Sequence, residues 1–307
     1  MKKALLFFLL LWVCQQEAFA QQDPMYTQYM FNQLVINPAY TGSKDQVDAV
    51  LLYRTQWVGF DGAPETTSLS VHSPIFGKSS NIGVSFVHDQ IGISENYYIT
   101  GYYAYRIDFD KFRLSMGINA EFKRQQMRWE LTNPLDFGDL AIPATADNIN
   151  IPNFGAGVYL DADRFYLGIA TPRLLQNDLD YTNGQPSVAS SAQQKRHIYL
   201  MGGFIMDISR DVKFKPSTAI RYTNNAPLSI DINASFLFAD RVWAGATWRN
   251  GDSFDIIAQL MLGKFRIGYS FDYTTTQLNA YNQGTHEIMI GLGIENRSKG
   301  IHHPRYF

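Results

Sequence analysis

The stretch FRLSMGINAEF, residues 112–122, decides the fold class of this chain. Its even-numbered residues are all apolar, and its odd-numbered residues are polar, charged or glycine. Successive side chains of a β-strand point to opposite faces of a sheet, so a period of two predicts a strand with one apolar face. The same alternation recurs in residues 154–161, 228–236, 265–273 and 286–294. The chain is therefore predicted to be all-β.

The length of these strands favours a membrane protein. Strands of soluble sandwiches usually have about five or six residues, whereas a tilted transmembrane strand needs about nine to eleven. A large soluble sandwich with one buried face is the alternative, because alternation alone fits both folds. Aromatic residues near the strand ends are typical of the girdles of outer-membrane barrels. These are Tyr97, Tyr98, Tyr102, Tyr103, Tyr105, Trp243, Trp248, Tyr269 and Tyr273. We predict a transmembrane antiparallel β-barrel.

The pattern predicts fourteen strands, an even number as in bacterial single-chain barrels. They are expected near residues 47–57, 66–73, 80–89, 96–107, 111–123, 152–161, 164–170, 196–206, 212–222, 227–238, 241–249, 253–262, 265–273 and 285–294. Two longer polar segments, residues 124–151 and 171–195, interrupt the regular spacing. They are too long for turns, so we expect external loops or plugs that fold inward.

The first twenty residues predict a secretory signal peptide. Lys2 and Lys3 precede an apolar core, and Ala18-Phe19-Ala20 supplies a cleavage site. Cys14 as a lipoprotein acceptor is the weaker alternative, because the preceding valine is not small. We therefore expect a signal peptide over residues 1–20, an N-terminal arm over 21–45, a barrel over 46–295 and a tail over 296–307. Without Cys14, the mature chain has no cysteine.

Composition and motifs argue against nucleic-acid binding and catalysis. The net charge of −2 leaves no excess of basic residues to neutralise phosphates. The sequence has no P-loop and no Gly-x-Ser-x-Gly elbow, which disfavours a lipid hydrolase or acyltransferase. His286 and Glu287 are neighbours in a predicted strand, so they point to opposite faces and cannot share a site. We expect no enzyme activity, no cofactor and no metal.

Charged and polar residues fall opposite the apolar face, where they would line the lumen of a barrel. Both signs of charge occur, which predicts paired charges in a hydrated lumen and argues against a pore selective for one sign. A ligand channel, as in a diffusion porin or a solute transporter, is the alternative. The predicted lumen residues are Arg54, Gln56, Arg113, Asn119, Glu121, Lys123, Lys213, Lys215, Arg221, Asp231, Arg266 and Asp272.

A series of short motifs, in order along nearly the whole mature chain, resembles the PorP/SprF family of the Bacteroidota type IX secretion system. The motifs are QDPMYTQYMFN (22–32), NPAYTG (37–42), YRTQW (53–57), FDGAPET (60–66), RHIY (196–199), KPS (215–217), GTHEIM (284–289) and PRYF (304–307). The resemblance implies a non-enzymatic integral outer-membrane protein of secretion and gliding motility. It also implies two kinds of partner: the periplasmic secretion ring, and secreted adhesins with a type B C-terminal signal.

Two aromatic segments are candidate partner surfaces. One lies in the arm and the other follows the first predicted strand; the alternative for the second is a girdle residue with a rigid turn. The candidate residues are Tyr26, Tyr29, Met30, Phe31, Asn32, Trp57, Phe60 and Pro64. Within the arm, Asp23-Pro24 favours a helix start and Asn37-Pro38 a stop. The arm is expected to dock in the lumen or against a periplasmic partner, either as a short helix or as an irregular segment.

Overall fold

The computed structural model describes residues 24–75, 79–131, 147–177, 181–182, 185–186 and 194–295. The expected signal peptide and the expected tail over residues 296–307 lie outside the described residues, as does Asp23 at the expected helix start. Within the described ranges, no helix is long and apolar enough to cross a membrane.

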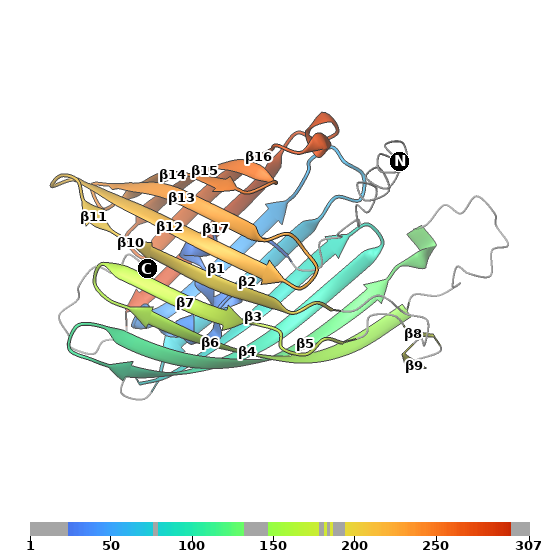
Figure 1. Cartoon of the computed structure of the whole chain (residues 1–307), viewed down its shortest axis with the longest axis horizontal. Coiled ribbons are helices and arrows are strands. Elements are labelled where there is room, and N and C mark those ends of the chain that lie inside the picture. Colours follow the sequence, from blue (N-terminus) through green and yellow to red (C-terminus); the bar gives the residue numbers. More distant parts are fainter. Residues whose placement is uncertain are drawn as a thin grey trace, which may run out of the picture.

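Fourteen antiparallel strand positions form a closed barrel, as the sequence predicts (Figure 1). Each barrel strand pairs with its neighbours along the chain, β1 pairs with β17, and the pairing of β10 with β12 closes the ring. The short β11 (Met206–Asp207) follows β10 and pairs with the same strand, β12. A separate hairpin joins β8 (Tyr181–Thr182) to β9 (Gln185–Pro186).

The bounds of the barrel strands agree closely with the predicted ranges. They are β1 (Gln46–Thr55), β2 (Glu65–Pro74), β3 (Ser80–Ile91), β4 (Ser94–Asp108), β5 (Arg113–Met127), β6 (Asp147–Asp161), β7 (Phe165–Thr171), β10 (His197–Phe204), β12 (Val212–Thr223), β13 (Ser229–Phe238), β14 (Val242–Arg249), β15 (Ser253–Leu262), β16 (Phe265–Thr274) and β17 (Thr285–Glu295). Two short 3-10 turns lie outside the wall, η4 (Trp129–Leu131) and η5 (Gln277–Ala280).

The outer surface of the barrel carries the apolar face of each strand. On β5, Ile118 is 60% exposed, whereas Asn119 and Glu121 face inward and are buried. Because a shift of one residue would exchange the two faces, these positions establish the register of the strand. The wide apolar surface is the part of the molecule that contacts lipid.

A charge at the centre of this apolar surface should be costly. We expect Ile118→Arg to lower the free energy of unfolding by about 2–4 kcal/mol, if the residue lies near the middle of the bilayer. Unfolding in guanidinium from lipid vesicles measures this change. Asp110→Arg, in the exposed turn before β5, is the matched control and should be near neutral. Equal losses in the two variants would contradict the placement of Ile118 in lipid.

Part of the predicted aromatic girdle is wrong. Tyr98, Tyr102 and Trp243 are buried inside the barrel, whereas neighbours such as Tyr103 and Trp248 are exposed on its surface. Proximity in sequence does not place two aromatic residues on one face, because strand side chains alternate. Only aromatic residues at the outward-facing positions of a strand, which carry its apolar face, can reach the membrane interface.

The first long polar segment is shorter than expected. Strands β5 and β6 continue into it and remain paired as far as Met127 and Asp147. The alternation of apolar and polar residues stops before the strand ends. The reason is that both faces of a hairpin that projects beyond the membrane contact water. The expected loop over residues 124–151 therefore contains the ends of two strands, and residues 132–146 lie outside the described structure.

The two rims of the barrel differ in the length of their connections. One rim has short turns, including the hairpin at Ala239 and Asp240, whose φ angles of 48° and 52° suit a type I′ turn. The other rim has the longer connections, among them residues 56–64 and 275–284. Bacterial barrels place short turns in the periplasm and longer loops outside.

The N-terminal arm contains no α-helix over the stretch expected to form one. It forms three 3-10 turns, η1 (Tyr29–Phe31), η2 (Gln33–Val35) and η3 (Pro38–Tyr40). Asn32, with a φ of −140°, lies between the first two turns and interrupts the helical conformation of the backbone there. Since 3-10 turns bond over a shorter interval, they let the arm change direction and follow the wall.

Candidate functional site

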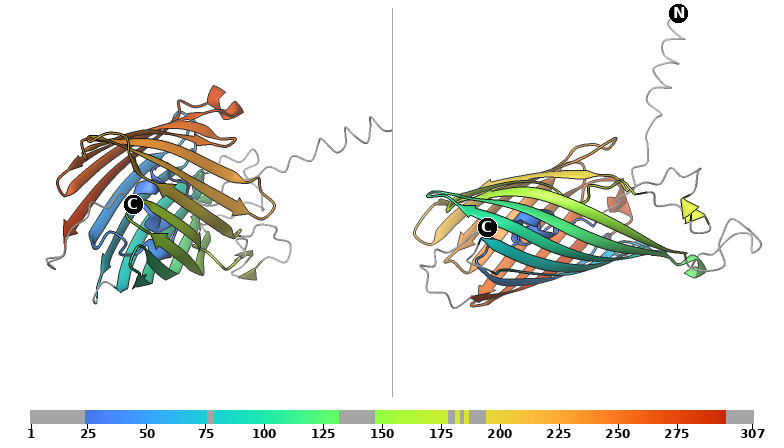
Figure 2. Two further views of the ribbon diagram at one scale, coloured as in Figure 1. Left: turned by 60° about the vertical axis from the view of Figure 1, so that its left-hand side comes forward. Right: turned by 90° about the horizontal axis from the view of Figure 1, so that it is seen from below.

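Residues 24–45, here called the arm, run through the lumen of the barrel (Figure 2). All side chains from Thr27 to Leu34 are buried. The arm contributes to the buried apolar cluster, which is completed by wall residues such as Trp243 and Tyr159. Its members from the arm are Tyr29, Met30, Phe31, Leu34, Ala39 and Tyr40. The apolar core of this barrel is therefore built around its own N-terminal segment.

Near its first residues, the arm is held by two carboxylates of the wall. The backbone N–H groups of Thr27 and Gln28 donate to the two carboxylate oxygens of Glu287, at 2.9 and 2.8 Å. The Thr27 hydroxyl donates to Asp272 at 2.6 Å and accepts from Arg54 at 2.7 Å. Arg54 also pairs with Asp272 at 2.9 Å and with Glu287 at 3.2 Å. One buried arginine thus pairs with two buried carboxylates. Donors of the arm add further hydrogen bonds to both carboxylates.

Removal of this arginine should be strongly destabilising. In Arg54→Ala, Asp272 and Glu287 would remain buried without their cation, which costs about 3–5 kcal/mol when one partner of a buried pair is removed. Unfolding of the purified barrel measures the loss. Arg164→Ala is the control, because the Arg164–Asp207 pair is exposed and is worth about 1 kcal/mol or less. Similar losses in both variants would contradict the anchoring role of Arg54.

A buried lysine lies among aromatic rings inside the lumen. The Lys215 ammonium is 5.6 Å from the ring centre of Phe31 in the arm, and 5.4 and 5.9 Å from those of Trp243 and Tyr166 in the wall. The rings of Phe31 and Trp243 are themselves 5.9 Å apart. Cation–π attraction is strongest where water is excluded, so this cluster ties the arm to β12 and β14.

The third turn of the arm rests on wall glycines. Asn37 begins η3, where its side-chain oxygen accepts from Ala39 N at 2.9 Å and its amide donates to the Val158 carbonyl at 3.1 Å. Gly117 and Gly157 are register partners on β5 and β6. A Cβ atom on Gly117 would lie 2.3 Å from Ala39 N, and one on Gly157 would lie 2.2 Å from Asn37 Oδ1. Glycine at both positions lets the arm touch the wall.

At its last residues, the arm is held at the rim of short turns. The Gly42 N–H donates to His72 Nδ1 at 2.9 Å. Arg106 pairs with Asp45 and donates to the Gly42 carbonyl. Burial, together with the Arg266 guanidinium nearby, lowers the pKa of Lys44 to about 8. The arm is therefore bonded to the wall along its whole described length.

The structure brings most of the predicted lumen charges into ion pairs. Five further members of the predicted set form ion pairs: Arg113 with Asp161 and Asp45, Glu121 with Arg173, Asp231 with Arg249, Arg266 with Asp48, and Lys213 with Asp240 at an exposed rim. Arg221 donates instead to Met25 and Ser229. Asn119 donates to the Pro172 carbonyl at 3.1 Å, Lys123 lies over the ring of Tyr98, and Gln56 is buried. The segment after β7 thus begins by folding inward at Pro172 and Arg173.

Several lumen charges are absent from the predicted set, although their positions obey the same alternation. Glu287 has the parity of the polar face of β17, and Asp48 has the parity of Arg54 on β1. Arg106 and Arg249 likewise lie on inner faces and are buried. The signal was therefore present in the pattern. His72 also faces inward, and among the described residues no cluster of three or more His, Cys, Asp or Glu side chains could hold a metal ion.

The candidate partner residues occupy two different environments. Tyr29, Met30, Phe31 and Asn32 are buried in the lumen, and Ser70 donates to Asn32 at 3.1 Å. Tyr26 is half-buried beside them. In the connection between β1 and β2, Phe60 is 46% exposed, Trp57 is half-buried and Pro64 is buried. Arm residues can meet a partner only after the arm leaves the wall, whereas Phe60 is accessible as it stands.

Fold and lumen together define a class: outer-membrane β-barrels whose lumen is occupied by their own N-terminal segment. The chain matches the family model of the type IX secretion system membrane protein PorP/SprF over residues 18–292. It therefore belongs to the PorP/SprF family and is an outer-membrane protein of the type IX secretion system. No curated protein in the comparison matches it.

Solved structures show similarity of fold alone. A toluene transporter of Ralstonia pickettii, TbuX, is 8% identical, with a TM-score of 0.50 over 87% of this chain and 92% of that one. A FadL homologue of Pseudomonas aeruginosa is 12% identical, with a TM-score of 0.48 over 88% and 94%. The protein Omp33 of Acinetobacter baumannii is 10% identical, with a TM-score of 0.43 over 82% and 99%.

Proposed function

We propose that this protein is a non-enzymatic component of the type IX secretion and gliding machinery that binds other proteins at its two rims. One rim would bind the periplasmic secretion ring, and the other would retain a secreted adhesin with a type B C-terminal signal at the cell surface. The observation that carries the proposal is the arm, because it contacts opposite parts of the wall at Glu287 and Val158. A lumen spanned in this way suits an anchor better than a passage for solutes.

The difference between the rims supports a separate rim for each partner. Short turns, such as residues 109–112 and 162–164, would face the periplasm and the ring. The longer connections would face the exterior, where the connection over residues 56–64 is paired with its neighbour: Val58 N donates to the Gly284 carbonyl, and Gln283 N donates to Val58 O. These backbone hydrogen bonds hold the connection that carries the exposed Phe60 against the neighbouring connection. Phe60 is therefore our candidate contact for the adhesin.

Loss of the Phe60 ring should impair retention of the adhesin without affecting the barrel. Truncation of an aromatic anchor commonly costs on the order of 2 kcal/mol or more in an interface. In Phe60→Ala cells, we expect adhesin to move from the cell surface to the medium, measured by immunoblotting of both fractions. Phe254→Ala, an equally exposed ring on the outer face of β15, is the control and should leave retention unchanged. Unchanged retention in Phe60→Ala would remove this ring from the proposal.

A partner function is tested further by affinity purification from outer membranes and identification of the bound proteins. Recovery of ring components and of an adhesin would support the proposal. A diffusion porin or solute transporter is the second candidate, favoured by the polar inner faces of the strands. Conductance of the intact protein in planar bilayers distinguishes the two, because a large steady conductance would favour the porin.

A further inference from the structure

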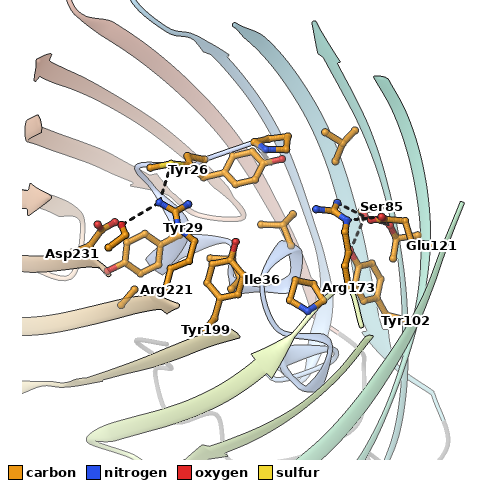
Figure 3. Close-up of a pocket in the computed structure, with 18 of the residues that line it drawn as sticks. Tyr26, Tyr29, Ile36, Ser85, Tyr102, Glu121, Arg173, Tyr199, Arg221 and Asp231 are labelled. Carbon is orange, nitrogen blue, oxygen red and sulfur yellow. Dashed lines mark hydrogen bonds and ion pairs between the residues drawn. The ribbon is translucent and has the colours of Figure 1, made fainter. Parts of the chain in front are cut away.

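A cavity lies between the first residues of the arm and the wall of the barrel (Figure 3). The arm contributes Met25, Tyr26 and Tyr29 to its lining, while the wall contributes Tyr102 on one side and Tyr199 on another. It therefore lies inside the lumen, with part of its lining on a segment that is not a barrel strand. Nothing in the proposed function above uses this cavity.

The charges around the cavity are unequally compensated. Arg173 binds Glu121 through two hydrogen bonds, at 2.5 and 2.8 Å. Arg249 binds Asp231 at 3.1 and 3.2 Å. Arg221 differs from both, because its guanidinium donates to the thioether sulfur of Met25 at 3.0 Å and to the Ser229 hydroxyl at 3.1 Å.

A thioether is a weak acceptor and a hydroxyl is an uncharged one, whereas the planar fork of a guanidinium suits a carboxylate. Within the described residues, no carboxylate lies within ion-pair distance of Arg221. Of the three arginines in the lining, Arg173 pairs with Glu121, and Arg249 pairs with Asp231, Asp252 and Asp255, whereas Arg221 has no carboxylate partner among the described residues. The unmatched charge is located at Arg221.

We propose that this cavity binds a small molecule with one carboxylate attached to an apolar or aromatic body. The carboxylate would accept two hydrogen bonds from Arg221 and take the place of Met25 Sδ and Ser229 Oγ. The apolar body would lie among the rings of Tyr26, Tyr102 and Tyr199, which line the same space. Few polar groups within a mainly apolar lining are typical of ligand sites.

Such a ligand would also influence the arm. Met25, Tyr26 and Tyr29 belong to the arm, so a molecule in the cavity contacts both the arm and the wall. Anything that binds the docked form better than the released form shifts the equilibrium toward the docked form. A small carboxylate at this site would therefore bridge the arm and the wall in place of the Met25–Arg221 contact.

The test uses the full mature protein in detergent and isothermal titration calorimetry. The probes are 3-phenylpropionate, its neutral amide, and N-acetyl-L-phenylalanine, which carries its carboxylate on a peptide-like body. We expect 3-phenylpropionate to bind and the amide to bind at least tenfold more weakly. A comparison of the two acids shows whether the site prefers a free acid or the C-terminal end of a peptide.

Arg221→Gln should lower the affinity for 3-phenylpropionate at least tenfold. Arg241→Gln, at an exposed turn outside the cavity, is the matched control and should bind as the unchanged protein does. Heat-modifiable electrophoretic mobility verifies that both variants are folded. The absence of binding by both acids, or equal affinity for acid and amide, would overturn the proposal. Secretion is not measured in this experiment, so its failure is distinguishable from failure of the proposed function.

Discussion

Gly117→Leu should open the barrel. The backbone of Pro38 and Ala39 lies where the new side chain must go, since even a Cβ atom at this position would be 2.3 Å from Ala39 N. Backbone cannot rotate aside as a flexible side chain can, so the arm must move away from the wall. Overpacking of this kind costs about 1–3 kcal/mol. We expect a large rise in single-channel conductance in planar bilayers and increased cleavage of the arm by added protease.

Gly101→Leu is the matched control for this prediction. Gly101 lies in β4, next to β5, but on the exposed face, and no atom lies within 4 Å of a Cβ placed there. The control should fold and conduct as the unchanged protein does. If Gly117→Leu gives a heat-modifiable barrel with the conductance of the control, then the arm does not close the lumen at this point.

Deletion of residues 22–32, with the signal peptide and its cleavage site retained, should give a folded but open barrel that no longer supports secretion. The deletion removes buried side chains such as Met30 and Phe31, each worth about 1.5–3 kcal/mol on burial. It also removes the donors to Glu287 and Asp272. The wall strands keep their own pairing, so the barrel should still assemble. Conductance, heat-modifiable mobility and export of adhesin are the three measurements.

A second variant separates the loss of docking from the loss of chain length. It keeps the arm at full length and replaces Tyr29, Met30 and Phe31 with serine, so that the apolar contacts with the wall disappear. We expect the same open barrel and the same loss of export. Normal secretion from the deleted protein would exclude the arm from the function, whereas an unfolded barrel would assign it to stability.

The arm shows how far local sequence can predict this site. Its aromatic residues predict a docked element, since a free segment gains nothing from so many rings. Its conformation was predicted less well: cues at residues 23–24 and 37–38 favour a helix, whereas the structure has three 3-10 turns. Helical propensity is a weak preference, and contacts with the wall override it. Those contacts come from residues 27 to 260 positions away in the sequence.

The charged residues of the lumen also show what the sequence predicts and what it leaves open. Alternation places Arg54, Asp231 and Asp272 on inner faces, but it does not say which charges will pair. Arg54 meets Asp272 and Glu287 because β1 closes on β17 and β17 lies beside β16. The curvature of the closed barrel decides which inward side chains approach one another across the lumen.

By itself, the sequence determined the all-β class, the strand positions, the register of the faces and the family. These follow from the alternation of apolar and polar residues and from short motifs. Both features involve residues close together in the chain, so the sequence alone contains them. Only the tertiary structure decided that the arm fills the lumen, that Gly117 and Gly157 make room for it, and that Arg221 faces a cavity. The physical reason is that packing across a closed barrel joins residues far apart in the chain, and no local pattern records their distances.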